Sequence, residues 1–305
     1  MIYTVTLNPS VDYHVETPTL HVGEVNVAQR QHYKAGGKGI NVSMALQNLH
    51  IKSEAFLLAG GFTGQFIVET LQEKGIVYHA VAVEEPTRIN VKLKQKVETE
   101  LNGRSPYVSE QVLRSLTQQL LDVVAPKDYV VLSGSLPESV AASTYATLLE
   151  QLESKGVYVV IDSKGKALEE ALPKRPFLIK PNQHEVSEWL GSTISTPQAA
   201  CNAGREMMKH GAEHVIVSMA GEGAVFVSEE VCVVANAPKG IVQHSIGAGD
   251  SVVAGFLAHY SQHGDLVEAF RYGVAAGSAS AFSHDLCTKA EVEALVDRVT
   301  ISPLD

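Results

Sequence analysis

Hydrophobic residues along the chain form short continuous runs separated by stretches with helical spacing. Continuous runs of this length predict strands that are buried on both faces, as in a parallel sheet covered by helices. Helical spacing between and after the runs places apolar residues on one stripe every three or four positions. This alternation predicts an α/β layered fold. The expected strands are residues 56–58, 129–132, 157–161, 177–179 and 215–217, and the expected helices are 110–124, 143–152, 249–262, 266–282 and 290–299.

The first hundred residues show a second pattern. Residues 2–7 are an apolar run rich in β-formers, which predicts a buried strand that ends at the Asn8-Pro9-Ser10 turn. Residues 12–16 and 24–33 alternate weakly and are polar, so we expect exposed strands there. Residues 88–101 alternate apolar and polar side chains around a polar turn at 95–96, which predicts a hairpin with one wet face. Later, residues 223–227 and 231–234 predict two edge strands.

Composition narrows the function classes. The chain has 305 residues and a formal net charge of −10 without a basic block, which argues against nucleic acid or an anionic membrane as the main partner. No apolar run approaches the roughly 18 residues that a membrane span needs. The three cysteines Cys201, Cys232 and Cys287 show no metal or CxxC spacing, so we expect reduced thiols and a cytoplasmic protein.

A glycine turn near the C-terminus is the strongest candidate for chemistry. Gly247-Ala248-Gly249-Asp250 precedes apolar residues with helical spacing, and free N–H groups at a helix start attract anions. The amides of Ala248 and Gly249 would then hold a phosphoryl group while Asp250 takes a proton from a hydroxyl. The alternative is that Asp250 only caps the helix, which is the common role of Asp at helix starts.

A second glycine turn lies near the other end of the chain. Residues 35–41 read Ala-Gly-Gly-Lys-Gly-Ile-Asn and again lead into a helical pattern. The turn is not a Walker A loop, because Lys38 is followed by Gly39 and not by Ser or Thr. Neither turn has the third glycine of the dinucleotide-binding fingerprint.

Together the two turns resemble the paired signatures of the PfkB (ribokinase-like) sugar kinase family. The resemblance also covers residues 6–12, 87–93, 133–137, 180–185 and 218–223, in family order and over essentially the whole chain. It implies a single ribokinase-like domain over residues 1–305: a three-layer α/β/α fold with a central, mainly parallel sheet. A small β-sheet lid would come from segments near 12–34 and 87–102.

The resemblance implies roles at the sugar end of the site. Asp12 matches a carboxylate that binds sugar hydroxyls, although Asp is also common in turns. Lys38 and Arg88 are cations of the kind that a phosphorylated sugar requires, since Arg can bind a phosphate in bidentate fashion. The alternative for each is an ordinary ion pair or solvated charge. The further substrate contacts expected are Gly36, Gly37, Asn41, Asn90 and Ser135, the last of which is equally well explained as a turn residue.

The resemblance also implies a nucleotide end. Asn182 and Glu185 match an Asn-x-x-Glu element that acts through Mg²⁺ and its waters, and oxygen ligands with retained water are what Mg²⁺ prefers. The same spacing is also that of a helix capping box. A zinc site is not expected, because Glu188 and not a second His follows His184-Glu185. The other expected contacts with ATP are Lys180, Ser218, Gly221 and Gly223.

The resemblance is strongest to the family members that use ATP to phosphorylate the 6-hydroxyl of fructose 1-phosphate. Kinases of tagatose 6-phosphate or of another phosphosugar are the alternative within the family. A catalytically silent sugar-phosphate sensor is the alternative from another class, because a fold does not determine a function. A homodimer paired through the lid is a further analogy, and no nucleic acid or membrane partner is expected.

Overall fold

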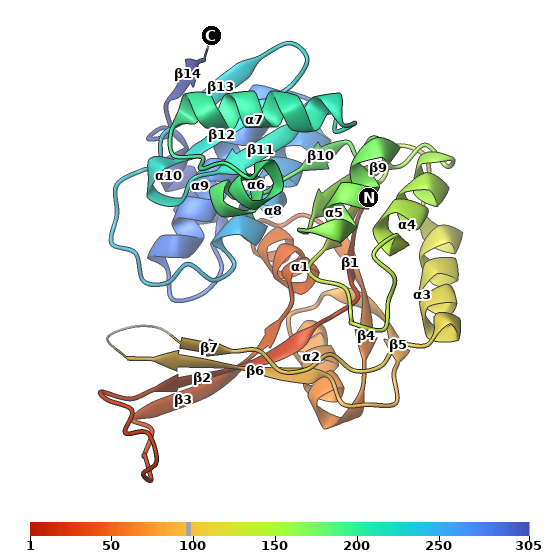
Figure 1. Cartoon of the computed structure of the whole chain (residues 1–305), viewed down its shortest axis with the longest axis vertical. Helices are drawn as coiled ribbons and strands as arrows, with labels where there is room; N and C mark the ends of the chain where they lie inside the picture. The colour runs from red at the N-terminus through yellow and green to blue at the C-terminus, as the bar shows by residue number, and fades with distance from the viewer. Residues whose placement is uncertain (96–98, 305) are drawn as a thin grey trace.

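The computed structural model describes residues 1–95 and 99–304 and contains two sheets (Figure 1). The large sheet has ten strands, and its strands from β11 to β5 run parallel. The continuous apolar runs all lie in it, as predicted. In spatial order the strands are β14 (Ile301–Pro303), β13 (Cys232–Ala235), β12 (Ala224–Val227), β11 (Val215–Ser218), β10 (Leu178–Ile179), β9 (Tyr158–Asp162), β8 (Tyr129–Ser133), β1 (Ile2–Thr6), β4 (Ser53–Ala59) and β5 (Val77–Ala82).

Helices cover both faces of the large sheet. One buried apolar cluster includes Ile40, Ile67, Phe256 and Phe270, and the other includes Leu116, Tyr145 and Met207. The three-layer α/β/α arrangement predicted from the sequence is therefore confirmed. The helices are α1 (Lys38–Asn48), α2 (Gly61–Glu73), α3 (Glu110–Val123), α4 (Thr144–Glu153), α5 (Lys166–Ala171), α6 (Gln183–Leu190), α7 (Pro197–Lys209), α8 (Ala248–His263), α9 (Leu266–Phe282) and α10 (Lys289–Val296), with short 3₁₀ turns at Leu172–Lys174 and Ala220–Glu222.

The small sheet projects from the edge of the main body as a lid (Figure 1). Its strand order is β3 (Arg30–Gly36), β2 (Ser10–Glu16), β6 (Arg88–Lys94) and β7 (Thr99–Leu101). The strand predicted over residues 24–33 is wrong at its start, because β3 begins at Arg30 and the polar residues before it form a loop. The predicted hairpin is present as β6 and β7, but part of its turn lies outside the described residues.

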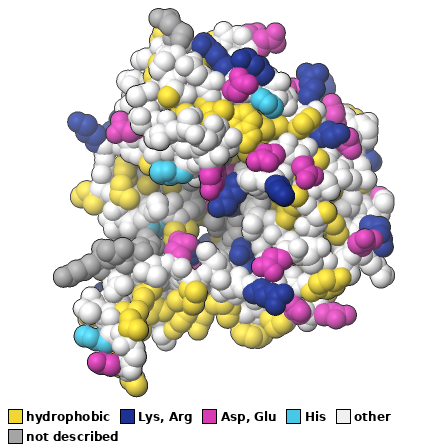
Figure 2. Space-filling view, viewed as in Figure 1, with side chains coloured by type: hydrophobic (Ala, Val, Ile, Leu, Met, Phe, Trp, Pro, Cys, Tyr) yellow, Lys and Arg dark blue, Asp and Glu magenta, His cyan; other side chains and the backbone are white. Residues whose placement is uncertain are grey.

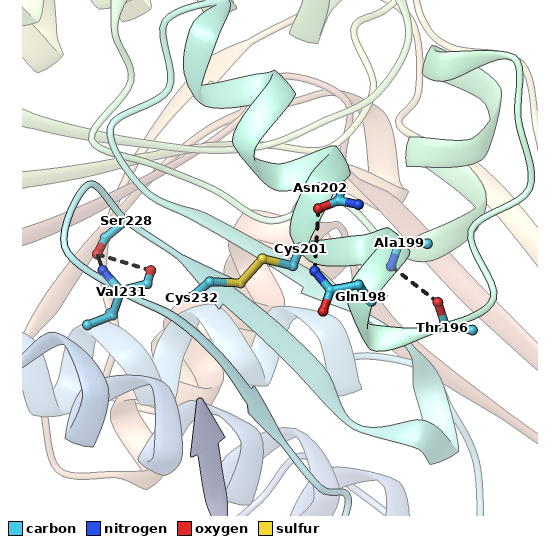
Figure 3. Close-up of a disulfide and its surroundings, with 8 residues drawn as sticks. All are labelled: Thr196, Gln198, Ala199, Cys201, Asn202, Ser228, Val231 and Cys232. Carbon is cyan, nitrogen blue, oxygen red and sulfur yellow. Dashed lines mark hydrogen bonds between the residues drawn. A yellow bond between two sulfur atoms is a disulfide. The ribbon is translucent and has the colours of Figure 1, made fainter. Parts of the chain in front are cut away.

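Two other expectations are corrected. The segments 223–227 and 231–234 are not edge strands: β12 lies between β11 and β13, and β14 pairs with β13 and becomes the edge. The cysteines are not all reduced: Cys201 on α7 and Cys232 on β13 form a disulfide with a Cα–Cα distance of 6.4 Å (Figure 3). The fold brings them together because α7 lies over β12 and β13, whereas their 31-residue separation in sequence carries no sign of the pairing. Cys287 is free and buried.

None of the helices in the described part of the chain is both long enough and apolar enough to cross a membrane.

Candidate active site

The late glycine turn forms the N-terminus of α8. Gly247 is the N-cap residue in the left-handed region at φ 76°, and a Cβ there would come within 2.5 Å of Leu286. Asp250 is the third residue of the helix and is buried. Its Oδ2 accepts a hydrogen bond from Asn41 Nδ2 at 2.7 Å, so the carboxylate reaches away from its own helix. Gly247, and not Asp250, is the N-cap residue of α8, so the capping interpretation of Asp250 is wrong.

The early glycine turn begins α1 directly opposite. Gly37 is the N-cap residue at φ 125°, and a Cβ on Gly39 would lie 2.4 Å from Thr6 Oγ1, so only glycine fits. The Asn41–Asp250 hydrogen bond joins the two turns although 209 residues separate them. The two turns therefore meet at one site.

The site contains a buried ion cluster that the sequence analysis missed. Asp162, fully buried at the end of β9, lies 2.8 Å from Lys38 Nζ and 3.5 Å from Lys180 Nζ. Lys180 Nζ would also contact a Cβ on Gly249 at 3.3 Å, which places this ammonium beside the late glycine turn. A signal did exist, because Asp162 directly follows a buried apolar run, and ligands of α/β sheets bind at the carboxyl ends of strands.

The cluster changes the protonation of its members. Burial raises the pKa of Asp250 to about 6, and the charge of Asp162 adds to the rise, while Lys38, Asn41 and Lys180 oppose it. Burial would raise the pKa of Asp162 too, but the two ammonium groups hold it below its ordinary value. Burial lowers the pKa of Lys38, yet Asp162 and Asp250 more than compensate and leave it raised. Asp250 is thus a carboxylate whose pKa suits proton transfer near neutral pH.

The sugar end predicted from the sequence lies on the lid. Asp12 Oδ1 accepts hydrogen bonds from Ser10 Oγ at 2.8 Å and from Asn90 Nδ2 at 3.0 Å. A Cβ on Gly36 would lie 2.7 Å from Asp12 Oδ2, so the glycine leaves the carboxylate room. Asp12 and Asn41 line the same cleft of about 490 Å³, together with Gly247. That volume falls within the usual range for small-molecule sites.

Other predicted sugar contacts have partners within the protein. The Arg88 guanidinium donates to the carbonyl oxygens of Asn8 at 3.2 Å and Pro9 at 3.4 Å. Ser135 is exposed and its Oγ accepts from Asn8 Nδ2 at 3.1 Å. Lys38 and Arg88, expected to act as a pair, therefore have different partners: Lys38 belongs to the ion cluster and Arg88 to the turn after β1.

The predicted nucleotide end also assembles. Asn182 pairs with Ser218 through a parallel bridge, which brings the start of α6 to the end of β11. Gly223 follows the 3₁₀ turn at φ 95°, where a Cβ would lie only 1.9 Å from the Ala235 carbonyl oxygen, while Gly221 has open space around it. Asn182 and Ser218 therefore lie side by side at the carboxyl end of β11, next to the turn that contains Gly221 and Gly223.

Glu185 forms the capping box that its spacing allowed. Its Oε2 accepts the N–H of Asn182 at 2.9 Å, and Asn182 Oδ1 caps α6 in return. The carboxylate also lines a shallow groove with Lys164 and His184. The described residues contain no group of three or more His, Cys, Asp or Glu that could hold a metal. The single carboxylate of Glu185 can serve Mg²⁺, because this ion keeps several waters and takes only one or two carboxylates in addition to nucleotide phosphates.

The lid reaches the main body across the mouth of the cleft. Lys34 Nζ on β3 donates to the His284 carbonyl oxygen at 3.1 Å and lies 3.5 Å from Asp285 Oδ1, in the loop between α9 and α10. Figure 2 shows the hollow between the lid and the body. The cleft is therefore covered by a sheet that contacts the opposite wall through exposed side chains.

Comparison with known proteins gives a consistent result. Residues 6–293 match the profile of the pfkB family carbohydrate kinases. A 1-phosphofructokinase of Bacillus subtilis is 45% identical over 304 residues, covering 100% of both chains. A D-tagatose-1-phosphate kinase of Bacillus licheniformis is 32% identical, again over 100% of both chains. The crystal structure of phosphofructokinase-2 from Escherichia coli with substrates and products has a TM-score of 0.92 and 30% identity, and the match covers 97% of this chain and 98% of that one.

Proposed function

Because the chain belongs to the pfkB family of carbohydrate kinases and is a sugar-phosphate kinase, we propose that it transfers the γ-phosphoryl group of ATP to the 6-hydroxyl of fructose 1-phosphate. The product would be fructose 1,6-bisphosphate. The observation that carries the proposal is Asp250: a buried carboxylate with its pKa raised to about 6, at the start of a helix and hydrogen-bonded to the opposite glycine turn. The choice of sugar follows the Bacillus subtilis relative.

In the proposed reaction Asp250 accepts the proton of the attacking hydroxyl. Ala248 and Gly249 are the first two residues of α8, and the first N–H groups of a helix have no acceptor within the helix. The Ala248 N–H donates to the Ser245 carbonyl oxygen at 3.3 Å, a bond that it would give up to the phosphoryl group. The two N–H groups would hold the moving phosphoryl group together with the positive end of the helix dipole. Positioning and charge stabilisation are what phosphoryl transfer demands of a protein.

We assign Lys38 and Lys180 to the transferred phosphoryl group. Asp162 holds both ammonium groups, and Lys180 Nζ lies beside Gly249 of the anion-binding turn. Lys38 also interacts electrostatically with Asp250. In this arrangement Asp162 is a positioning residue that keeps two cations where negative charge arrives.

The two ends of the site would be divided between lid and body. Asp12, oriented by Ser10 and Asn90, binds sugar hydroxyls, and Gly36 leaves its carboxylate room to do so. Asn182, Ser218 and Gly221 border the nucleotide. Mg²⁺, held through Glu185 and water, would neutralise charge on the nucleotide phosphates.

A second phosphosugar has a specific argument in its favour. The Bacillus licheniformis relative is named for D-tagatose 1-phosphate, which differs from fructose 1-phosphate in one hydroxyl configuration. A silent sensor is disfavoured, because a sensor has no need of a buried carboxylate with a raised pKa opposite the sugar-binding turn. The relatives described above are named for other sugar phosphates than tagatose 6-phosphate.

An assay of ADP release tests these alternatives directly. The protein would be incubated with ATP, Mg²⁺ and one of fructose 1-phosphate, tagatose 1-phosphate, tagatose 6-phosphate, fructose 6-phosphate or fructose. We expect fructose 1-phosphate to give the highest kcat/KM. Asp250→Asn should lower kcat at least about 100-fold with little change in sugar binding. Absence of ADP release with every sugar phosphate would refute the proposal.

We also propose that two chains pair through the lid. Tyr13 lies opposite Tyr33 and Val91, and Val91 lies opposite Leu101, so these side chains share the face of the lid sheet opposite to the one that carries Asp12. Tyr33 is 55% exposed and Leu101 71% exposed. Figure 2 shows hydrophobic side chains gathered on this side of the molecule, below the hollow. Light scattering of the wild type and of Leu101→Glu tests the pairing: we expect a dimer and a monomer, and a monomeric wild type would contradict it.

A further inference from the structure

Three basic side chains form one row across the cleft-facing side of the lid. In the strand register, His14 of β2 lies directly opposite His32 of β3 and Lys92 of β6. Directly opposite residues in neighbouring strands point to the same face of a sheet. The face is the one that carries Asp12, because side chains two positions apart in a strand share a face. His14, His32 and Lys92 accordingly line the same cleft as Asp12 and Asn41.

The strand also fixes how far this row lies from the sugar-binding carboxylate. His14 is two residues beyond Asp12 along β2, which corresponds to a rise of about 6.8 Å in an antiparallel strand. Arg88 lies in the row on the other side of Asp12, opposite Ser10, and its guanidinium is engaged by the carbonyl oxygens of Asn8 and Pro9. A sugar bound at Asp12 would therefore have His14, His32 and Lys92 next to it, two residues farther along the lid strands.

The row carries more basic groups than acidic ones. The two imidazole rings stack with centroids 4.7 Å apart and an interplanar angle of 3°. Burial, together with the charges of His32, Lys34 and Lys92 and against that of Asp12, lowers the pKa of His14 to about 4, so this ring is uncharged near pH 7 and still carries an N–H donor. Lys92 is 8% exposed and its Nζ lies 2.7 Å from Glu100 Oε1. The row therefore offers one buried ammonium and two rings with N–H donors to the oxygens of an additional anion.

We propose that His14, His32 and Lys92 bind the phosphate that the sugar already carries. The inference rests on the proposed phosphosugar kinase activity and adds to it the residues that select a phosphorylated over an unphosphorylated sugar. Ring N–H groups and an ammonium are hydrogen-bond donors that suit phosphate oxygens, and hydrogen bonds to a charged group are the stronger kind. With Asp250 at the accepting hydroxyl, the row places the existing phosphate toward the outer part of the lid.

The test compares variants of the row on phosphorylated and unphosphorylated sugar. Lys92→Met and the double variant His14→Gln/His32→Gln would be assayed with fructose 1-phosphate, with fructose, and with ATP varied. We expect the KM for fructose 1-phosphate to rise about tenfold or more in each, the scale of losing a hydrogen bond to a charged group. The kcat, the KM for ATP and the kcat/KM for fructose should change by less than about threefold. The preference for the phosphorylated sugar should fall accordingly.

Lys94→Met is the matched control. Lys94 is on the same strand one row farther out, its side chain is 64% exposed, and its Nζ is 3.9 Å from Glu16. We expect its KM for fructose 1-phosphate to stay within about twofold of wild type, as an exposed ion pair contributes little. An equal effect of Lys94→Met and Lys92→Met would overturn the assignment, because it would indicate a general charge effect.

The outcomes separate this inference from the proposed function. If the wild type phosphorylates no sugar phosphate, the proposed function fails and the inference fails with it. If the wild type is active but both row variants keep the wild-type KM for fructose 1-phosphate, only the inference is overturned. If the variants lose activity with fructose, fructose 1-phosphate and ATP alike, and melt at lower temperature, the row is structural and the inference is also overturned.

Discussion

The raised pKa of Asp250 predicts how the reaction depends on pH. A base must be deprotonated to act, and a pKa of about 6 leaves roughly 90% of the carboxyl ionised at pH 7 and roughly 10% at pH 5. The kcat/KM for fructose 1-phosphate should therefore be half-maximal near pH 6 and fall about tenfold per pH unit below it. An unperturbed aspartate would instead place this limb near pH 4.

The sugar phosphate itself has an ionisation near pH 6, so a variant is needed to identify the titrating group. Asp162→Asn removes the carboxylate whose charge raises the pKa of Asp250, while Lys38 and Lys180 remain and lower it. The acidic limb should move to lower pH in this variant, whatever its absolute rate. ADP release measured from pH 4.5 to 8.5 by the assay above would reveal the shift. An acidic limb that stays at the same pH in both proteins, or a flat wild-type profile, would refute the assignment of Asp250 as base.

The same residues give three further predictions. The folded pKa of Asp250 lies above its ordinary 3.8, so the unfolding free energy falls as pH rises from about 4 to about 6. Asp250→Asn should therefore raise the unfolding free energy at pH 7 by up to about 3 kcal/mol, as measured by urea titration. Equal stability of the two proteins at pH 7 would contradict this. Gly36→Ala places a Cβ 2.7 Å from Asp12 Oδ2 and so displaces the carboxylate. The KM for the sugar should rise at least about tenfold while the KM for ATP stays unchanged. A rise in both KM values would indicate misfolding. Cys201→Ser should lower the unfolding free energy by about 2–4 kcal/mol, with a reductant giving the same loss in the wild type and no further loss in the variant.

Much of the fold follows from local patterns. The continuous apolar runs became central strands because both of their faces are covered, and the helix predicted over 110–124 was found as α3, ending within one residue of that estimate. Residues 24–29 were misjudged because a few alternating apolar residues in a polar loop imitate a strand. β13 is not the edge of the sheet because β14 pairs with it, and β14 is a three-residue strand too short to leave a pattern.

The candidate site was predictable where glycine turns marked it and less so where contacts are distant in sequence. Asn41 and Asp250 stood in motifs, but their hydrogen bond depends on how α1 and α8 are placed on the sheet. Asp162 could have been found at the end of its strand, yet its two lysine partners come from other segments. The Cys201–Cys232 pair depends on the packing of α7 over β13, which no local pattern encodes.

The contact of Lys34 with the loop between α9 and α10 bears on how substrates reach the cleft. The Lys34 and Asp285 side chains are 36% and 69% exposed, so water competes for both. An ion pair of this kind contributes about 1 kcal/mol or less, and ions in solution screen it further. Opening the lid at this point is therefore energetically inexpensive, and the rate at which sugar enters and product leaves should respond to ionic strength.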